Sequence, residues 1–287
     1  MWIILSIITA FFYAVEGAWI KKLTARVNSY TITWSLFTFA IPVAVIPLFI
    51  TGIPEIKGAF LWSAAGSLLI NTVAFTLFVN ALKIAPLSMT YPFLAFTPVF
   101  IIVTGYVFLG ELPGLYGITG IFFVTLGAYV LNIKKIRSNL LAPFKAIKNE
   151  KGAVFMLVVA VLWSFAASLD KVAVLSSGSY FYVTFFNIGF FLLYMPFLFK
   201  VNPQFMKEVR VNLGPLFLLG VVGGLMSICQ MSAVNIAYVS YVIAIKRAGM
   251  IFALIIGWMF FNEKMTLYKT VGTLLILSGI AIIALLS

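Results

Sequence analysis

The chain has 287 residues, of which 63% are hydrophobic and only 9% are charged, whereas soluble globular domains contain about 45–50% apolar and about 25% charged residues. This composition excludes an ordinary soluble domain and is typical of a membrane protein. The formal net charge of +12 does not indicate a nucleic-acid partner, because the basic residues lie in short gaps between apolar blocks. The lack of histidine excludes His-based triads and HExxH metal sites, and the single cysteine, Cys229, excludes a disulfide within the chain.

Apolar blocks long enough to cross a bilayer core of roughly 30 Å as helices follow one another along the chain. We predict ten spans, at 2–20, 31–50, 58–82, 84–109, 114–133, 152–172, 179–199, 214–236, 238–261 and 267–286. The sequence therefore predicts an all-α integral membrane fold with two five-helix repeats, 1–133 and 152–287. Between them lies a basic amphipathic linker, 134–151, which is either a short helix on the inner leaflet or a plain tether.

The basic residues outside the spans are distributed unequally between alternate loops. The loops on one side carry 15 Lys and Arg residues, whereas those on the other carry only Lys57 and Lys171. By the positive-inside rule this bias places the linker in the cytoplasm and both termini outside a plasma membrane. The first block is followed by Lys21, Lys22 and Arg26 and indicates a retained anchor rather than a cleaved signal peptide.

An internal repeat connects the two halves of the chain. A shift of 152 residues places 81–127 on 233–279 without a gap and gives 12 identities in 47 positions. The informative identities are those of small and polar residues, which match at Ala85/Ala237, Ser88/Ser240, Gly105/Gly257, Glu111/Glu263, Tyr116/Tyr268, Gly120/Gly272 and Gly127/Gly279. A weaker match at a shift of 150 pairs the first span with the sixth. Because five spans per unit is an odd number, the second copy must enter the membrane from the opposite side, as in transporters with inverted repeats.

The segments FLGELPGLYGITGIFFVTLGAYVL (108–131) and FFNEKMTLYKTVGTLLILSGIAII (260–283) are the clearest copies of the repeated motif. In these segments the chain resembles the EamA-type members of the drug/metabolite transporter superfamily. The resemblance implies metabolite export or exchange through a central cavity lined mainly by spans 1, 3, 4, 6, 8 and 9. Members of this superfamily are generally drawn with both termini in the cytoplasm, so the orientation indicated by the charges departs from the family pattern.

The sharpest candidate site is the pair Lys246 and Arg247, near the middle of the ninth predicted span. Charges at that depth are costly and usually face a partner or a water-filled cavity. The pair can bind a carboxylate or phosphate of the substrate, form structural ion pairs with Glu16 or Asp170, or snorkel to the interface. It also resembles the basic pair of the organic-phosphate translocator branch. The first repeat has Leu94 and Ala95 at the matching positions, so the internal symmetry is broken there.

Two acidic residues lie in or near predicted spans. Glu16, in the first span, is either a proton-coupling carboxylate, since burial disfavours the charged form, or a charge partner of Lys21 and Lys22. Asp170 lies beside Lys171 at the predicted end of the sixth span, and we expect it at the membrane interface.

Several uncharged polar and aromatic residues near mid-span are further candidates for a substrate cavity, because amides facing lipid would lack partners. Pro92 and Pro98 in the fourth span indicate a hinge or a kink, and for Asn187 we prefer plain hydrogen bonding between helices. The predicted substrate-binding residues beside the basic pair are Trp163, Tyr241, Tyr91, Asn71, Gln230 and Asn235.

These features together predict a secondary transporter that moves a small anionic metabolite by alternating access, as a monomer or homodimer surrounded by lipid. No cofactor, metal or nucleic acid is expected. The alternative is an exporter of neutral or cationic metabolites, amino acids or drugs. A membrane-embedded enzyme or signalling protein is the alternative from another class. An enzyme is disfavoured because no pair of intramembrane carboxylates is evident, and a receptor leaves the inverted duplication unexplained.

Overall fold

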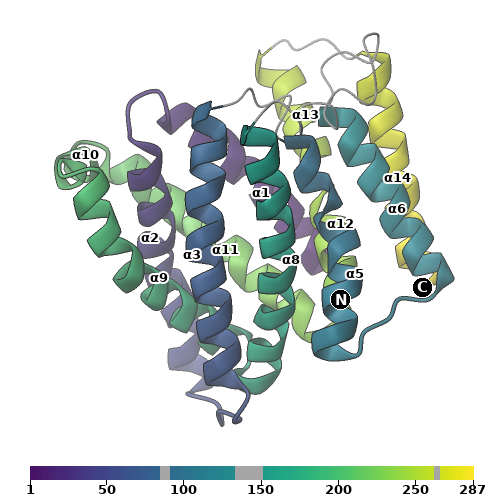
Figure 1. The fold of residues 1–287 in the computed structure, drawn as a ribbon, viewed down its shortest axis with the longest axis horizontal. Helices are drawn as coiled ribbons and strands as arrows, with labels where there is room; N and C mark the ends of the chain where they lie inside the picture. The colour runs from purple at the N-terminus through teal and green to yellow at the C-terminus, as the bar shows by residue number, and fades with distance from the viewer. Residues whose placement is uncertain (85–90, 133–150, 262–265) are drawn as a thin grey trace. The chain divides into compact units, whose positions relative to one another are not determined.

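A computed structural model describes residues 1–84, 91–132, 151–261 and 266–287 (Figure 1). The regular elements within these ranges are helices, which confirms the predicted all-α class. The chain forms two compact units, Met1–Thr72 with Leu169–Ile236 (unit 1) and Val73–Ser168 with Ala237–Ser287 (unit 2). Each unit therefore combines residues from both predicted repeats. The predicted linker 134–151 lies outside the described residues, apart from Lys151.

Unit 1 is built around the long apolar helices that follow the N-terminus and those that precede Ile236. Its complete helices are α1 (Trp2–Leu23), α2 (Ser29–Thr51), α9 (Ser179–Val201), α10 (Phe205–Val211) and α11 (Leu213–Ile236). It also contains the first part of α3 (Phe60–Ile84) and the last part of α8 (Lys151–Ser177). Helix α11 packs against both α1 and α2, and α2 packs against α9.

Small residues permit the close packing of α11 in unit 1. A Cβ atom added at Gly220 would lie 2.3 Å from the Cβ atom of Phe39 on α2, and one at Gly223 would lie 2.4 Å from Leu36. The Glu16 carboxylate, from α1, lies beside the same glycine, 3.4 Å from the added Cβ. These glycines thus allow the two backbones to approach, as is common where membrane helices associate.

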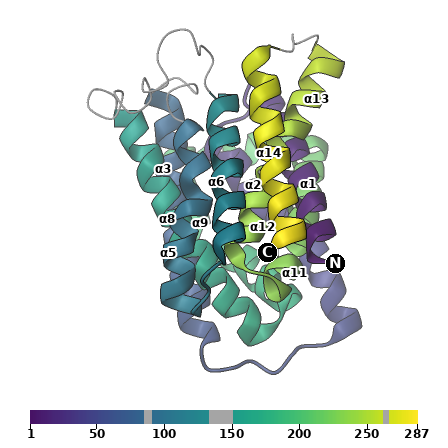
Figure 2. The ribbon, with the colours of Figure 1, turned by 90° about the vertical axis from the view of Figure 1, so that its right-hand side faces the viewer.

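Unit 2 contains the closing helices of both repeats. Its complete elements are the 3₁₀ helix η1 (Tyr91–Phe96), α5 (Thr97–Leu109), α6 (Leu115–Asn132), α12 (Val239–Lys246), α13 (Gly249–Phe261) and α14 (Leu267–Leu286). The remaining parts of α3 and α8 complete it. Helices α6 and α14 pack against each other over an extensive contact, and they lie side by side in Figures 1 and 2.

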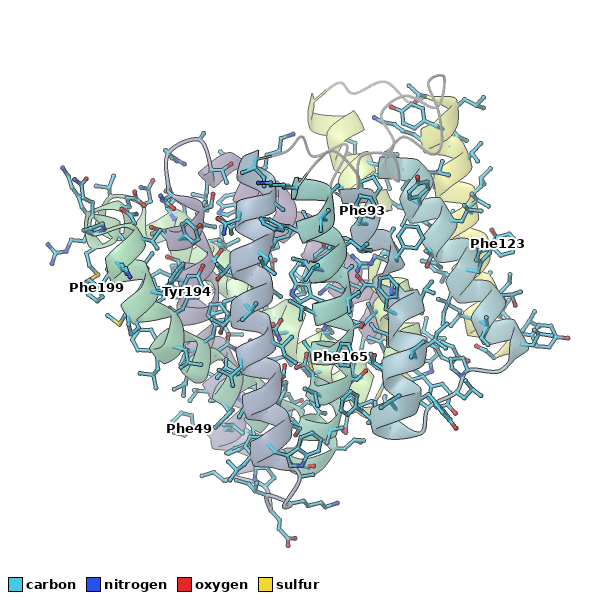
Figure 3. All side chains as sticks on the ribbon, in the orientation of Figure 1. Phe49, Phe93, Phe123, Phe165, Tyr194 and Phe199 are labelled. Carbon is cyan, nitrogen blue, oxygen red and sulfur yellow. The ribbon has the colours of Figure 1, made fainter. Side chains whose placement is uncertain are left out.

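Within the described ranges, eight helical segments are long and apolar enough to span a membrane, and Leu115–Leu131 is a shorter apolar helix. The predicted span 238–261 is divided between α12 and α13. Large apolar side chains also point outward, as Phe49 on α2 and Phe199 on α9 do in Figure 3. Phe49 is 86% exposed. Such outward apolar surface suits lipid rather than water, and the chain is a multi-pass membrane protein.

The repeat predicted from the sequence reappears in the element boundaries. Helices α2 and α9 both have 23 residues and begin 150 residues apart. Helices α5 and α13 both have 13 residues and begin 152 residues apart, and α6 and α14 begin at the same spacing. Matched starts at the predicted shifts support a duplication of the whole helical unit.

The contact between α6 and α14 is symmetric in the same register. A Cβ at Gly127 would lie 2.6 Å from the carbonyl oxygen of Gly272, and one at Gly279 would lie 2.6 Å from that of Gly120. The shift of 152 converts the first contact into the second. Because the glycine that comes earlier on one helix meets the later one on the other, the helices run antiparallel, as an inverted two-fold relation requires.

Candidate functional site

The basic pair lies at a break in the ninth predicted span. Helix α12 ends at Lys246 and α13 begins at Gly249. Between them the backbone switches to i→i−3 hydrogen bonds, from Arg247 N to Ala244 O (2.9 Å) and from Ala248 N to Ile245 O (2.8 Å). Arg247 is only 5% exposed, and Lys246 is half-buried. The structure thus places two cationic side chains where one helix ends and the next begins.

The first repeat has a break at the matching position. The 3₁₀ helix η1 ends at Phe96 and α5 begins at Thr97, which is 152 residues before Gly249. Pro98 lies in the first turn of α5, where its missing N–H group costs no helical hydrogen bond. Leu94 and Ala95, which match Lys246 and Arg247, are fully buried. The fourth span of each repeat is therefore broken at the matching position, but only the break in the second repeat carries charged residues.

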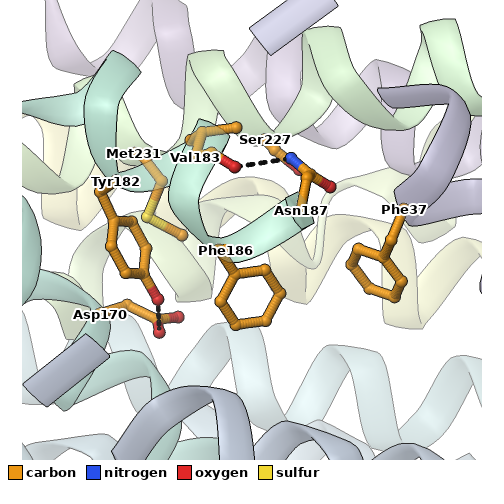
Figure 4. A pocket seen from close by; sticks show the side chains of 8 residues that line it. All are labelled: Phe37, Asp170, Tyr182, Val183, Phe186, Asn187, Ser227 and Met231. Carbon is orange, nitrogen blue, oxygen red and sulfur yellow. Dashed lines mark hydrogen bonds between the residues drawn. The ribbon is translucent and has the colours of Figure 1, made fainter. Parts of the chain in front are cut away.

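A second polar cluster lies inside unit 1, around Asp170 (Figure 4). The hydroxyl groups of Ser67 on α3 and Tyr182 on α9 both donate to Oδ1 of this carboxylate. The Asn71 amide in turn donates to Ser67 Oγ at 3.1 Å and to Ser67 O at 3.1 Å. Ser67 and Tyr182 are almost fully buried. Three helices thus converge on one carboxylate within an apolar bundle, where a buried charge requires such partners.

A cavity of about 60 Å³ adjoins this carboxylate and has room for a few water molecules. Aromatic rings form much of its wall, and the Asn187 Nδ2 group donates to Val183 O at 2.7 Å (Figure 4). This bond lies within α9, whereas we expected Asn187 to bond between helices, and its side chain also lines the cavity. The lining residues are Phe37, Asp170, Tyr182, Val183, Phe186, Asn187, Ser227 and Met231.

The position of Asp170 corrects our sequence-based expectation. We expected this residue at the membrane interface, because the sixth span was predicted to end at 172. Helix α8 continues to Ser177, so Asp170 lies within the helix and contacts Ser67 and Tyr182. The signal that was missed is the length of the apolar run, which continues through Val172–Leu175 after the Asp170–Lys171 pair.

Of the other predicted site residues, those in unit 1 lie at different depths. Asn71 is buried and belongs to the Asp170 cluster. Gln230 is half-buried on α11, next to the cavity residue Met231, whereas Asn235 is exposed near the end of that helix. Glu16 is buried on α1 against Gly223. Asn71 therefore belongs to the Asp170 cluster, whereas Asn235 does not line the cavity.

The aromatic candidates lie in unit 2. Trp163 packs on α8 against Phe75 and Phe78 of α3, each at a ring distance of 5.5 Å. Tyr241 is 8% exposed and contacts Gly117 of α6, where an added Cβ would lie 2.1 Å from its hydroxyl oxygen. Tyr91 is the first residue of η1. These contacts give Trp163 and Tyr241 well-defined packing positions in unit 2.

The repeated acidic residue Glu111 contacts the start of α12. Its Oε2 accepts a hydrogen bond from Val239 N, the first residue of that helix, at 3.1 Å. A carboxylate at this point satisfies an N–H group that has no partner within the helix and is favoured by the helix dipole. Glu111 therefore anchors the helix that ends at the basic pair. Its repeat partner, Glu263, lies outside the described residues.

The comparisons with known proteins agree with this architecture. The EamA-like transporter family matches residues 1–133 and again residues 150–285. One solved structure, described only as the crystal structure of a protein, superposes with a TM-score of 0.73 at 15% sequence identity. The alignment covers 99% of this chain and 96% of the other, so the likeness establishes a shared fold. No curated protein matches the chain.

Proposed function

Because this chain belongs to the EamA-like transporter family and is thus a membrane transporter of the drug/metabolite type, we propose that it carries a small organic anion by alternating access. Lys246 and Arg247 recognise a carboxylate or phosphate group of this substrate. The observation that carries the proposal is the helix break at which these two residues lie. Broken helices in transporters supply binding groups to substrates near the middle of the membrane.

The chemistry of the break favours an anion over other ligands. The Arg247 guanidinium offers a planar fork for two oxygen atoms, and Lys246 adds a point charge. Helix α13 begins two residues after Arg247, but the amides of Met250 and Ile251 donate to Arg247 O and Ala248 O, so the two side chains supply the positive charge. The buried matching residues Leu94 and Ala95 offer no such groups. Only the second repeat therefore carries a charged binding site at this position.

The remaining features of the proposed mechanism rest on the repeat and on the charge distribution. We infer ten spans, with α12 and α13 together forming the ninth, and an orientation in the plasma membrane that places the linker in the cytoplasm. Trp163, Tyr91, Tyr241, Gln230 and Asn235 remain candidates for shaping the substrate path. Glu16 remains a candidate for proton coupling or charge pairing.

Exchange measurements in proteoliposomes test the anion site. Preloaded vesicles with the wild-type protein, Arg247→Ala or Lys246→Ala are compared for exchange of labelled carboxylates and sugar phosphates. Loss of a charge-assisted hydrogen bond costs about 1.5–3 kcal/mol, so we expect each variant to bind the transported anion about 10-fold to 150-fold more weakly. Arg210→Ala, which removes an exposed arginine from α10, is the matched control and should exchange normally.

The conservative variant Arg247→Lys separates charge from geometry. It retains the positive charge but loses the fork, so we expect exchange to be intermediate between those of the wild type and Arg247→Ala. Normal anion exchange by both alanine variants would rule out the proposed site. Exchange of neutral or cationic compounds alone would establish the alternative substrate class.

A further inference from the structure

The cavity beside Asp170 in unit 1 combines one carboxylate with aromatic walls and uncharged acceptors. Phe186 lies between Phe37 and Tyr182, at ring distances of 5.8 Å and 5.9 Å. The Asp170 carboxylate and the side chains of Asn187 and Ser227 supply the polar part of the lining (Figure 4). Ring faces attract cations, and a carboxylate does so more strongly. This lining is complementary to a positive charge.

The fixed hydrogen bonds determine which polar atoms can receive a ligand. Asn187 donates one N–H of its Nδ2 group to Val183 O, and its amide oxygen is an acceptor. The Tyr182 hydroxyl donates to Asp170 and therefore holds the carboxylate rather than competing with it. Asp170, Asn187 and Ser227 thus provide three acceptor groups, and a primary ammonium group has three N–H donors.

We propose that the cavity lined by Asp170, Asn187, Ser227, Phe37 and Phe186 binds a small organic ammonium group. A hard metal cation is less well suited, because such ions prefer six or more oxygen ligands and gain little from apolar walls. Phe37, Val183, Phe186 and Met231 make half of the lining residues apolar. With a volume of about 60 Å³, the cavity admits an ammonium group with one or two carbon atoms but not a tetraalkylated one.

The ammonium site lies within unit 1 and does not include Lys246 or Arg247, which belong to unit 2. The proposal therefore does not rest on the proposed function, and the experiment below tests the two separately.

Thermal unfolding of the purified full-length protein, followed by intrinsic tryptophan fluorescence, tests the site. Potassium chloride is replaced at constant ionic strength by methylammonium, ethylammonium, sodium or tetraethylammonium chloride. We expect methylammonium and ethylammonium to raise the unfolding temperature by about 2 °C at about five times their Kd, and sodium and tetraethylammonium to have no effect.

Variants locate the effect at the cavity. Asp170→Asn should abolish the shift, and Phe186→Leu should weaken ammonium binding about 3-fold to 30-fold through loss of its ring. The matched control is Phe181→Leu, which removes a ring that packs on Phe60 and does not line the cavity. Ser227→Ala should weaken binding, whereas Ser63→Ala, at a buried serine bonded within its own helix, should not.

Each outcome has a defined meaning. The absence of a shift with either small ammonium ion, an equal shift in Asp170→Asn, or a shift with sodium alone would overturn the proposal. If Asp170→Asn does not fold, Phe186→Leu and Phe181→Leu are compared instead. Weaker ammonium binding in Phe186→Leu alone supports the proposal, and equal binding in the two variants overturns it. Ethylammonium should shift the unfolding temperature of Arg247→Ala as it shifts that of the wild type, because Arg247 does not line the cavity. If anion exchange fails but the ammonium shift remains, only the proposed function is refuted.

Discussion

The contact between α6 and α14 predicts the effect of one added methyl group. In the change Gly127→Ala, the new Cβ would lie 2.6 Å from the carbonyl oxygen of Gly272 and 2.8 Å from the backbone nitrogen of Ile276. Both are backbone atoms, so no side chain can rotate away to make room. Ordinary contact begins at 3.4 Å, and the helices must therefore separate by about 0.8 Å at this point.

The size of the effect follows from two opposing contributions. Overpacking in a close contact costs about 1–3 kcal/mol, and the exchange of glycine for alanine in a helix recovers about 1 kcal/mol. We expect a net loss of about 0–2 kcal/mol, with the unfolding temperature lowered by up to about 4 °C. Gly279→Ala should have the same effect within about 0.5 kcal/mol, because the shift of 152 relates the two contacts.

Thermal unfolding in detergent can be followed with a dye that fluoresces on reaction with a thiol, because Cys229 is the single cysteine and is only half-buried on α11. The control is Gly17→Ala on α1, where an added Cβ would meet no atom within 4 Å and should stabilise the helix. If Gly127→Ala unfolds at the same temperature as Gly17→Ala or above it, the close symmetric contact is refuted.

Three further changes test local features of the fold by the same unfolding measurement. Glu111→Ala removes the acceptor of the Val239 N–H group and should cost about 0.5–2 kcal/mol, whereas Glu111→Gln should recover part of this loss. Gly178→Ala places a side chain at a φ of 75° before α9 and should cost about 1–2 kcal/mol; an unchanged unfolding temperature would contradict this conformation. Gly189→Ala should be close to neutral, because the added Cβ meets mainly the flexible end of Leu68; a loss above about 2 kcal/mol would show that Leu68 cannot move.

The sequence was sufficient to predict the helical class, the membrane environment, the family and the repeat. These depend on hydropathy and on identities between the repeats such as Gly120/Gly272 and Gly127/Gly279, which the structure brings into one symmetric contact. The break of the ninth span could not be read in the same way. The apolar run around Lys246 and Arg247 contains no proline, and these two residues alone are too short a polar segment to indicate a loop. Hydropathy therefore predicts a continuous helix through them.

The Asp170 cluster shows a different limit. Ser67 and Tyr182 are common residues in an apolar helix, and nothing in their local sequence indicates a shared partner. Their convergence depends on how α3 packs against the consecutive helices α8 and α9, and Ser67 lies 103 residues before Asp170 along the chain. Asn71 was predicted because an amide in a span needs a partner. Serine and tyrosine hydroxyls give a weaker signal, since a serine can bond to its own helix.

The antiparallel pairing of α6 with α14 also constrains how the protein can be synthesised. Helix α6 ends at Asn132 and α14 begins at Leu267, so about 135 residues separate the two. At a translation rate of about 5–20 residues per second, α6 waits roughly 7–27 s in the bilayer before its partner emerges. During this interval its glycine face is covered only by lipid or by insertion factors. We therefore expect chains that terminate before α14 to be recognised and degraded as unassembled membrane helices, even though most of the transporter has already been made.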